Sequence, residues 1–276
     1  MTRIEGWKPL SPDRTAALSD ARLNAYFAAQ VVSALGATHL PLQAFGSHGN
    51  LAWSDEAGGV LVGRPVSGLR AALDVAGLRW MVLDSDGGIH AFEAANGRPV
   101  AAGLSWLRDV LSEHGVRPLP LEMLPHSLPD SPLRDGAPLS ADDADALAEL
   151  ARIFSNARAL LAHVTADLSQ VSEPRVWPHQ FDTGCAQVLS DTSMVGFGVS
   201  PGDAHIDAPY LYAWPWPVPD AADRPELPAG RWDDRGEDGL FAVLPLSELP
   251  ADGDAQAAMA LDWLTAALGA CRSVAG

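Results

Sequence analysis

The sequence predicts an α+β fold in which antiparallel sheets pack against helices. Short extended segments follow one another between residues 50 and 93 without helices between them, which favours antiparallel over parallel pairing. A second group of such segments lies between residues 181 and 244. Segments in which apolar residues recur at helical spacing precede, separate and follow the two groups.

The first group of strands is predicted to lie between two helices. The first helix begins at Ser11-Pro12-Asp13, where Ser11 can cap it, and ends at Gly36. An amphipathic helix over 104–114, ended by Gly115, follows the strands. Asp86-Gly87 predicts a hairpin turn between the last two strands. The predicted strands are 50–53, 60–62, 69–75, 79–83 and 89–93.

The second group follows a connector and a long helix. Six prolines in 118–138 exclude a helix or a central strand, so this segment is expected to cross the surface in extended form. Ser140 and Asp143 resemble a capping box and open a helix near 140–166. A last helix over 254–271 places Cys271 on its apolar face. The predicted strands are 181–189, 194–199, 209–213 and 240–244.

We expect residues 1–276 to form a single compact domain. Each half, 40–115 and 174–276, offers short strands followed by a helix, with the long helix near 140–166 joining them. This order is typical of two pseudo-repeated strand-strand-helix units. The identity between the halves is too low to decide whether they are a true repeat.

Composition excludes several classes of partner. With 47% hydrophobic residues the chain can bury a sizeable core, and its formal net charge of −17 repels nucleic-acid phosphates and anionic lipid headgroups. No stretch has the character of a signal peptide or a membrane span. Cys185 and Cys271 lie far apart, which favours buried thiols in a reducing compartment. We expect a cytoplasmic protein that binds neither nucleic acid nor membranes; oligomeric state is left open.

Residues that can do chemistry concentrate between positions 177 and 216. His179 and Asp182 are the sharpest pair, because an imidazole titrates near neutral pH and a carboxylate can orient it as a general base. If Phe181 begins a strand, both side chains can serve one site only if His179 still lies in the turn made by Pro178. The alternative is a packed histidine bonded to a backbone carbonyl.

A metal centre is the second interpretation of the histidines. His48, His126 and His179, with Asp203 or His205, provide enough donors for one zinc, iron(II) or manganese ion. No H-E-x-x-H or comparable spacing supports it. The sequence leaves open whether the site holds such a divalent metal or works without one.

Aromatic residues share one face of the third strand in the second group. Pro215 and Pro217 make the end of this strand an edge or a polyproline-like segment. With Asp203 nearby, the rings could bind a sugar or a planar ligand, or they could cap the core beneath the loop 219–238. The four rings are Tyr210, Tyr212, Trp214 and Trp216.

The segment Gly198-Val199-Ser200-Pro201-Gly202 matches the G-x-S-x-G pattern of serine hydrolases. In such enzymes the backbone N–H after the serine binds the oxyanion, and Pro201 has none. No helical pattern follows. A type II turn with Pro201 and Gly202 at its centre accounts for the same residues.

Three of these segments resemble a bacterial family of uncharacterised proteins. That family carries W-P-H-H-F-D, then S-P-G-D, then a P-Y-x-Y-x-x-P-x-P strand. The corresponding segments here begin at Trp177, Ser200 and Pro209, and the resemblance runs from Leu124 to the last helix. It implies membership but no activity. Gln180 stands where the family has a second histidine, which weakens the metal interpretation.

Three functions remain at this point. The first is an enzyme that acts on a small polar or aromatic molecule. The second is a non-catalytic small-molecule binder that uses the aromatic strand, and the third is a structural or interaction protein whose motif residues only hold turns. The first requires one cleft that gathers His48, His126, His179, Asp182 and Asp203.

Overall fold

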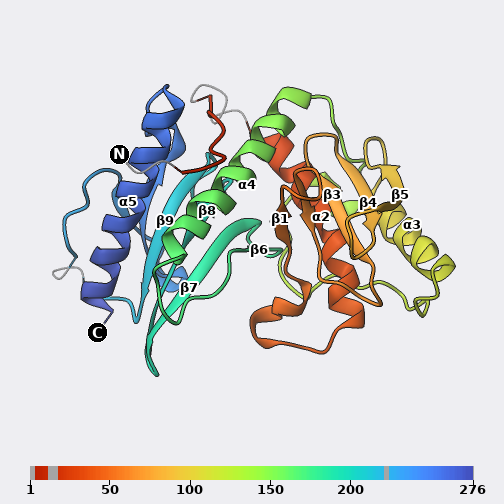
Figure 1. The fold of residues 1–276 in the computed structure, drawn as a ribbon, viewed down its shortest axis with the longest axis horizontal. Helices are drawn as coiled ribbons and strands as arrows, with labels where there is room; N and C mark the ends of the chain where they lie inside the picture. The colour runs from red at the N-terminus through yellow and green to blue at the C-terminus, as the bar shows by residue number, and fades with distance from the viewer. Residues whose placement is uncertain (1–3, 12–17, 221–223, 276) are drawn as a thin grey trace. The chain divides into compact units, whose positions relative to one another are not determined.

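The computed structural model describes residues 4–11, 18–220 and 224–275. In these ranges it contains antiparallel sheets with packed helices, which confirms the α+β fold class (Figure 1). The chain divides into two compact units. The β1–β5 unit comprises residues 18–151 and 175–181, and the β7–β11 unit comprises 1–17, 152–174 and 182–276.

The sheet of the β1–β5 unit is an antiparallel meander, because each strand pairs with the next one along the chain. The strands agree with the predicted segments to within about two residues. They are β1 (Ala52–Ser54), β2 (Val60–Val62), β3 (Arg70–Asp74), β4 (Arg79–Leu83) and β5 (Ile89–Ala94).

The predicted hairpin joins β4 and β5. Gly87 has a φ of 85°, and the Asp84 carboxylate accepts the backbone N–H groups of Asp86 at 2.9 Å and Gly88 at 2.7 Å. These bonds and the Gly87 backbone hold the tight turn and lower the pKa of Asp84. The aspartate–glycine turn prediction is confirmed.

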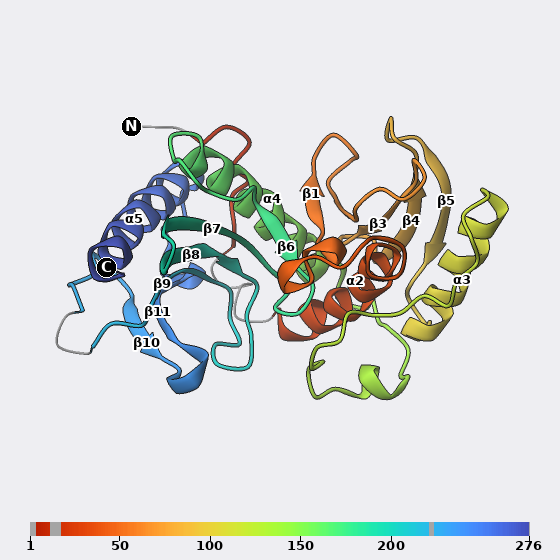
Figure 2. The ribbon, with the colours of Figure 1, turned by 90° about the horizontal axis from the view of Figure 1, so that it is seen from below.

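Trp80 of β4 contacts both helices that pack on this sheet, α2 (Ser19–His39) and α3 (Val100–Glu113). Its indole N–H donates to the carbonyl of Ala28 in α2 at 3.0 Å. Its ring also fills the space beside Gly103 in α3, where a Cβ would lie 2.6 Å away. Figure 2 shows α3 beside β5, at the side of the sheet away from β1.

Gly36 does not end the first helix, contrary to prediction. The helix continues to His39, and the predicted start at Pro12 and Asp13 lies outside the described residues. A Cβ at Gly36 would lie 2.3 Å from the carbonyl oxygen of His48. The glycine is therefore needed for close packing of another segment against the helix.

The proline-rich connector contains one short 3-10 helix, η2 (Pro132–Asp135), and otherwise no helix or strand, as predicted. It leads into α4 (Ala144–Thr165). The cap of α4 is Asp143, whose carboxylate accepts the N–H of Ala146 at 2.9 Å. Ser140 instead accepts the N–H of Asp142, so its predicted capping role is wrong.

In the β7–β11 unit the strands follow the order β10-β11-β9-β8-β7. Because β11 lies between β9 and β10, this order differs from the meander of the other unit, and the pseudo-repeat is not confirmed. The short strand β6 (Arg175–Trp177) belongs to the β1–β5 unit, where Val176 bridges Leu51. The strands are β7 (Asp182–Ser190), β8 (Ser193–Ser200), β9 (Tyr210–Trp216), β10 (Arg231–Asp234) and β11 (Leu240–Pro245).

The two faces of this second sheet differ. Val199 and Leu211 point toward the side covered by α4, together with Ile153 and Leu160 of that helix. The last helix, α5 (Gly253–Val274), packs beside β9 and β8 and buries Cys271 as predicted. The glycines of β7 and β8 and the aromatic rings of β9 share the other face.

The end of β9 is an edge, as its prolines predict. Pairing with β8 continues to Trp216, whereas pairing with β11 stops at Ala213. Pro215 therefore lies where β9 has a partner on one side only, and its missing N–H is tolerated there.

The role of Gly36 can be tested by a single methyl group. We expect Gly36→Ala to lower the free energy of unfolding by about 2 kcal/mol or more, because the new Cβ meets the His48 carbonyl. The measurement is urea denaturation. A matched control is Gly269→Ala in α5, where a Cβ meets nothing within 4 Å and should stabilise the helix by about 0.5–1 kcal/mol. Equal stability of Gly36→Ala and the wild type would contradict the packing role.

Candidate functional site

A row of polar residues on α2 organises the candidate site in the β1–β5 unit. Tyr26, Gln30 and Ser33 recur at intervals of four and three on a helix whose other buried residues are apolar, mostly alanine and valine. The Gln30 amide donates to the carbonyl of Pro178 at 2.9 Å, and the Ser33 hydroxyl donates to the carbonyl of Gly49 at 2.9 Å. These bonds attach two sequence-remote segments to one helix face.

His126 brings a third segment, the proline-rich connector, to the same face. Its Nε2 lies 3.2 Å from the Tyr26 hydroxyl, and its backbone N–H donates to the carbonyl of Leu124 at 3.0 Å. The ring is half-buried. The hydroxyl can donate to Nε2 or accept from it, depending on the tautomer, and in both cases it fixes the ring orientation.

His179 lies beside His126, with ring centroids 6.3 Å apart in an edge-to-face arrangement. It occupies a turn over residues 178–181, as the sequence required for a role in a site. Two backbone bonds to the carbonyl of Trp177, from Gln180 and Phe181, close this turn. The His179 side chain is exposed, and the Trp177 ring stands 5.8 Å from it, also edge to face.

Phe181 holds the turn in a strained conformation. Its φ is 57°, a value that side chains with a Cβ rarely adopt, while its ring is buried and packs edge to face on Tyr26 at 5.6 Å. Such strain persists only where the surroundings compensate for it, and it is frequent at functional sites. The buried ring therefore fixes the position of the turn that carries His179.

The pKa shifts in this cluster favour the neutral forms of its titratable groups. Desolvation by burial lowers the pKa of His126, and the backbone of Leu124 opposes this shift by favouring the protonated ring. Desolvation also lowers the pKa of His179, and His126 lowers it further by charge repulsion. Burial raises the pKa of Tyr26 to about 12. At neutral pH both imidazoles are therefore available as bases or acceptors, and the tyrosine keeps its proton.

Several buried polar atoms of the same unit have no hydrogen-bond partner among the described residues. Such atoms are costly unless water or a ligand satisfies them. They are Gln30 Oε1, His48 Nδ1, Asn50 Oδ1 and His126 Nδ1.

The three predicted metal ligands do not form a metal centre. His126 and His179 converge, but across the described ranges no group of three His, Cys, Asp or Glu side chains is placed to hold an ion. His48 is buried, at 3% exposure, in the short helix η1 (Ala44–Gly49). The metal interpretation therefore has no geometric support.

Asp182 belongs to the other unit, where it opens β7. Its Oδ2 accepts a short hydrogen bond from the Tyr212 hydroxyl, while its buried Oδ1 has no partner among the described residues. Desolvation by burial raises the pKa of this carboxyl to about 6, against the lowering effect of Tyr212. A catalytic pairing of Asp182 with His179 stays a prediction.

Glycines make room for the rings of β9 on this face of the sheet. A Cβ at Gly184 or Gly198 would lie 2.5 Å or 2.7 Å from the Tyr212 hydroxyl oxygen, and one at Gly196 would lie 2.1 Å from the Trp214 indole. Each of these glycines lies on β7 or β8, and Gly198 and Gly196 pair directly with Tyr212 and Trp214. Rings that cover glycines on neighbouring strands stabilise a sheet.

Both carboxylate oxygens of Asp203 accept hydrogen bonds from residues of its own unit. One carboxylate oxygen accepts the N–H groups of His205 and Ile206, and the other accepts from Tyr210 and, at 2.8 Å, from Arg235. The Arg235 side chain is 6% exposed and lies over the Phe241 ring at 4.4 Å. These bonds and the Arg235 charge outweigh burial and lower the pKa of Asp203. The geometry is that of a loop anchor.

The aromatic residues of β9 share one face, and they differ in exposure. Tyr210 and Tyr212 are buried, Trp214 is half-buried, and Trp216 is 54% exposed. The two tyrosines form a core cluster with Val243. This arrangement matches the interpretation that the rings cap the core, and it leaves Trp216 as the ring most accessible to a ligand.

Ser200 and Cys185 offer no nucleophile. The Ser200 hydroxyl accepts the N–H of Gly202, whose φ of 107° fits the turn predicted there, and residues 201–209 form no helix. Burial raises the pKa of Cys185 to about 12, so its thiol stays protonated.

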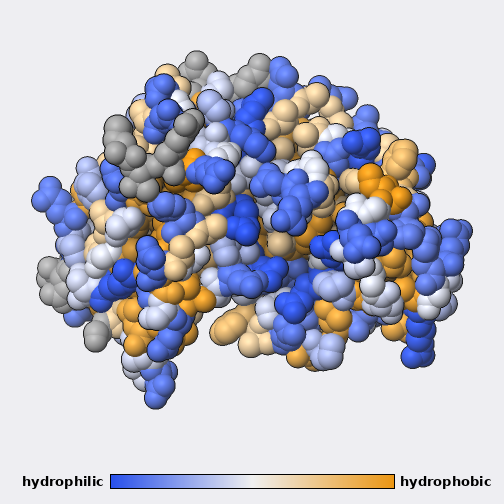
Figure 3. All heavy atoms as spheres, in the orientation of Figure 1, coloured by the Kyte–Doolittle hydropathy of each residue, from blue (hydrophilic) through white to orange (hydrophobic). Residues whose placement is uncertain are grey.

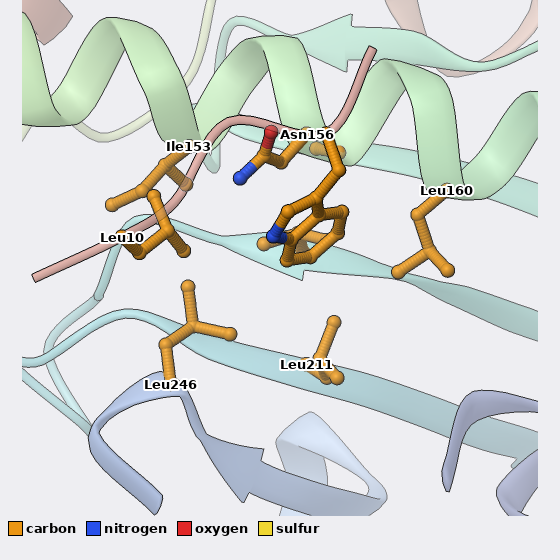
Figure 4. A pocket seen from close by; sticks show the side chains of 9 residues that line it. Leu10, Ile153, Asn156, Leu160, Leu211 and Leu246 are labelled. Carbon is orange, nitrogen blue, oxygen red and sulfur yellow. The ribbon is translucent and has the colours of Figure 1, made fainter. Parts of the chain in front are cut away.

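A small apolar cavity lies between α4 and the sheet of the β7–β11 unit (Figure 4). It measures about 10 Å³ and is lined by leucines such as Leu10, Leu160 and Leu211. Such a volume holds about one water, and an apolar lining keeps it dry.

On the face drawn in Figure 3, hydrophilic side chains separate several hydrophobic groups. No described helix is long and apolar enough to cross a membrane.

Comparison with protein-family models, with curated proteins and with solved structures finds no match to this chain. The resemblance to the uncharacterised bacterial family therefore stays a prediction.

Sequence reasoning missed the α2 residues that build the site. Tyr26 and Gln30 carry polar groups on the buried face of an alanine-rich helix, and this combination was the available signal. Arg235 was missed because its partners, Asp203 and Tyr210, lie more than twenty residues away in sequence.

The raised pKa of Asp182 predicts how stability depends on pH. Its pKa rises from 3.8 to about 6 on folding, so the folded state binds this proton more tightly. Stability from this group is therefore present below pH 4 and is lost as pH rises to about 6. Asp182→Asn should remove this loss, so from pH 4 to pH 7 it should gain up to about 3 kcal/mol relative to wild type.

The measurement is urea denaturation at each pH. The control is Asp191→Asn, an exposed carboxylate in the turn between β7 and β8, whose stability profile should run parallel to that of the wild type. A parallel profile for Asp182→Asn would refute the raised pKa.

Proposed function

We propose that the protein binds a small polar or aromatic molecule at the cluster of Tyr26, His126, Trp177 and His179, and that this site performs general acid–base chemistry. The observation that carries the proposal is the convergence of His126 and His179, which lie 53 positions apart in sequence, with their ring centroids 6.3 Å apart. Their lowered pKa values support a role as neutral bases.

The geometry supports different roles for the two histidines. His126 is half-buried and oriented by the Tyr26 hydroxyl, as a base needs an orienting partner. His179 is exposed and meets the ligand from the solvent side. Its edge-to-face contact with Trp177 provides an aromatic wall, which favours a ligand with a planar ring.

The buried polar atoms without partners support a polar ligand. Gln30 Oε1 is an acceptor and His126 Nδ1 can donate or accept, and both residues bond to other members of the cluster's segments. A ligand or ordered water that reaches any of them would recover the cost of their burial. A purely structural cluster would more often be fully paired.

A cytoplasmic setting is part of the proposal. Cys185 and Cys271 are both free and buried, which suits a reducing compartment. The formal charge of −17 makes nucleic acids and anionic membrane surfaces unfavourable partners.

The test is a fragment titration followed by NMR. Planar polar probes such as benzoate, nicotinamide and uracil are added to the isotope-labelled protein. At least one probe should shift the resonances of Tyr26, His126 and His179, and its affinity should fall about ten-fold or more in His126→Gln or His179→Gln. His163→Gln, an exposed histidine on α4, serves as the control and should bind as the wild type does.

Both site variants should remain folded, because His179 is exposed and His126 is half-buried. If no probe shifts these resonances, or if His179→Gln binds every probe as tightly as wild type, the proposed site is wrong.

A further inference from the structure

The segment Ile4–Leu10 is held between α4 and α5 by two buried carboxamides. Asn156 of α4 accepts the N–H of Lys8 at 2.8 Å and donates to its carbonyl at 2.7 Å. Gln256 of α5 accepts the N–H of Leu10 at 2.9 Å and donates to its carbonyl at 2.8 Å. Each side chain thus pairs with both backbone groups of one residue.

These four hydrogen bonds resemble those of a β-ladder, with two side chains in place of the neighbouring strand. Lys8 and Leu10 stand two positions apart, as residues do whose backbone groups face the same neighbouring strand. Pro9 lies between them, and its ring packs where a Cβ on Gly253 would lie, at 2.8 Å. These four hydrogen bonds contact the backbone groups of the segment and not its side chains.

The two carboxamides depend on this segment for their partners. Asn156 and Gln256 are 2% and 0% exposed, and the bonds described above join both of them to the segment. Without it, two buried amides would lose these hydrogen bonds, which is costly in an apolar setting. Side chains placed in this way are expected of a receptor for peptide backbone.

Apolar contacts complete the groove. Ile4 and Leu10 are buried, and the Trp7 indole N–H donates to Gln256 at 3.4 Å. Figure 4 shows Leu10 between Ile153 of α4 and Leu246, beside the small cavity. The groove between α4 and α5 therefore gives Leu10 apolar neighbours beside the two amides that bond to the backbone.

We propose that the groove between α4 and α5 is a binding site for extended, proline-containing peptides, and that Ile4–Leu10 is its resident ligand. A peptide with the same chemistry, supplied from outside the chain, takes its place when the resident segment is weakened. Covalent attachment gives the resident segment a high effective concentration, so it protects the groove in the intact chain.

The test uses the full-length chain and a fluorescent peptide of residues 4–11. In the variant Trp7→Ala/Leu10→Ala the resident segment loses its apolar contacts, and the peptide should bind at least ten-fold more tightly than to the wild type. Fluorescence anisotropy measures the affinity. If circular dichroism shows that the double variant has unfolded, Trp7→Ala alone replaces it, because this ring is only half-buried.

Chemical changes in the peptide test whether its backbone hydrogen bonds contribute to binding, without altering the protein. Replacing the Leu10 amide by an ester removes the N–H that Gln256 accepts and should weaken binding about ten-fold. An ester at Gly6 is the matched control and should bind as the unmodified peptide does. No binding to the weakened chain, or equal binding of both esters, would overturn the proposal.

Discussion

The candidate site depends on one face of α2, where Tyr26, Gln30 and Ser33 make hydrogen bonds and Gly36 allows close contact. An isolated bridge between Leu51 and Val176 joins the segments near residues 48 and 178, and the segment near residue 126 lies in no strand. Buried backbone carbonyls on two of these segments need donors, and the helix supplies them. The physical constraint is therefore hydrogen-bond satisfaction on an otherwise apolar helix, and the two neighbouring imidazoles are its consequence.

In the β7–β11 unit, glycines leave the space that a buried polar contact needs. Asp182 and Tyr212 share a buried hydrogen bond, and the Tyr212 hydroxyl fits only because Gly184 and Gly198 have no Cβ. Asn156 and Gln256 of the same unit form hydrogen bonds with the backbone of the segment Ile4–Leu10. In both units, buried polar side chains fix segments that have no regular secondary structure of their own.

Local patterns predicted the strands and helices well, because alternation, turn residues and helical spacing act over few residues. The Asp86-Gly87 hairpin and the edge at Pro215 follow from backbone chemistry alone. β10 was missed because Arg231–Asp234 is short and polar, and Gly36 was misjudged because its contact with His48 is remote in sequence. The sequence placed His126 and His179 in one site, but it could not exclude His48 or find Tyr26, since both depend on how the chain folds back on α2.

The coupling between the two imidazoles tests the account most directly. NMR titration of the His179 ring should give a pKa below its ordinary value of 6.5 in the wild type, because of desolvation and the neighbouring His126. In His126→Gln the second cause is removed, so the pKa of His179 should rise, whereas the control His163→Gln should leave it unchanged. An identical pKa of His179 in the wild type and in His126→Gln would show that the two rings do not share a site.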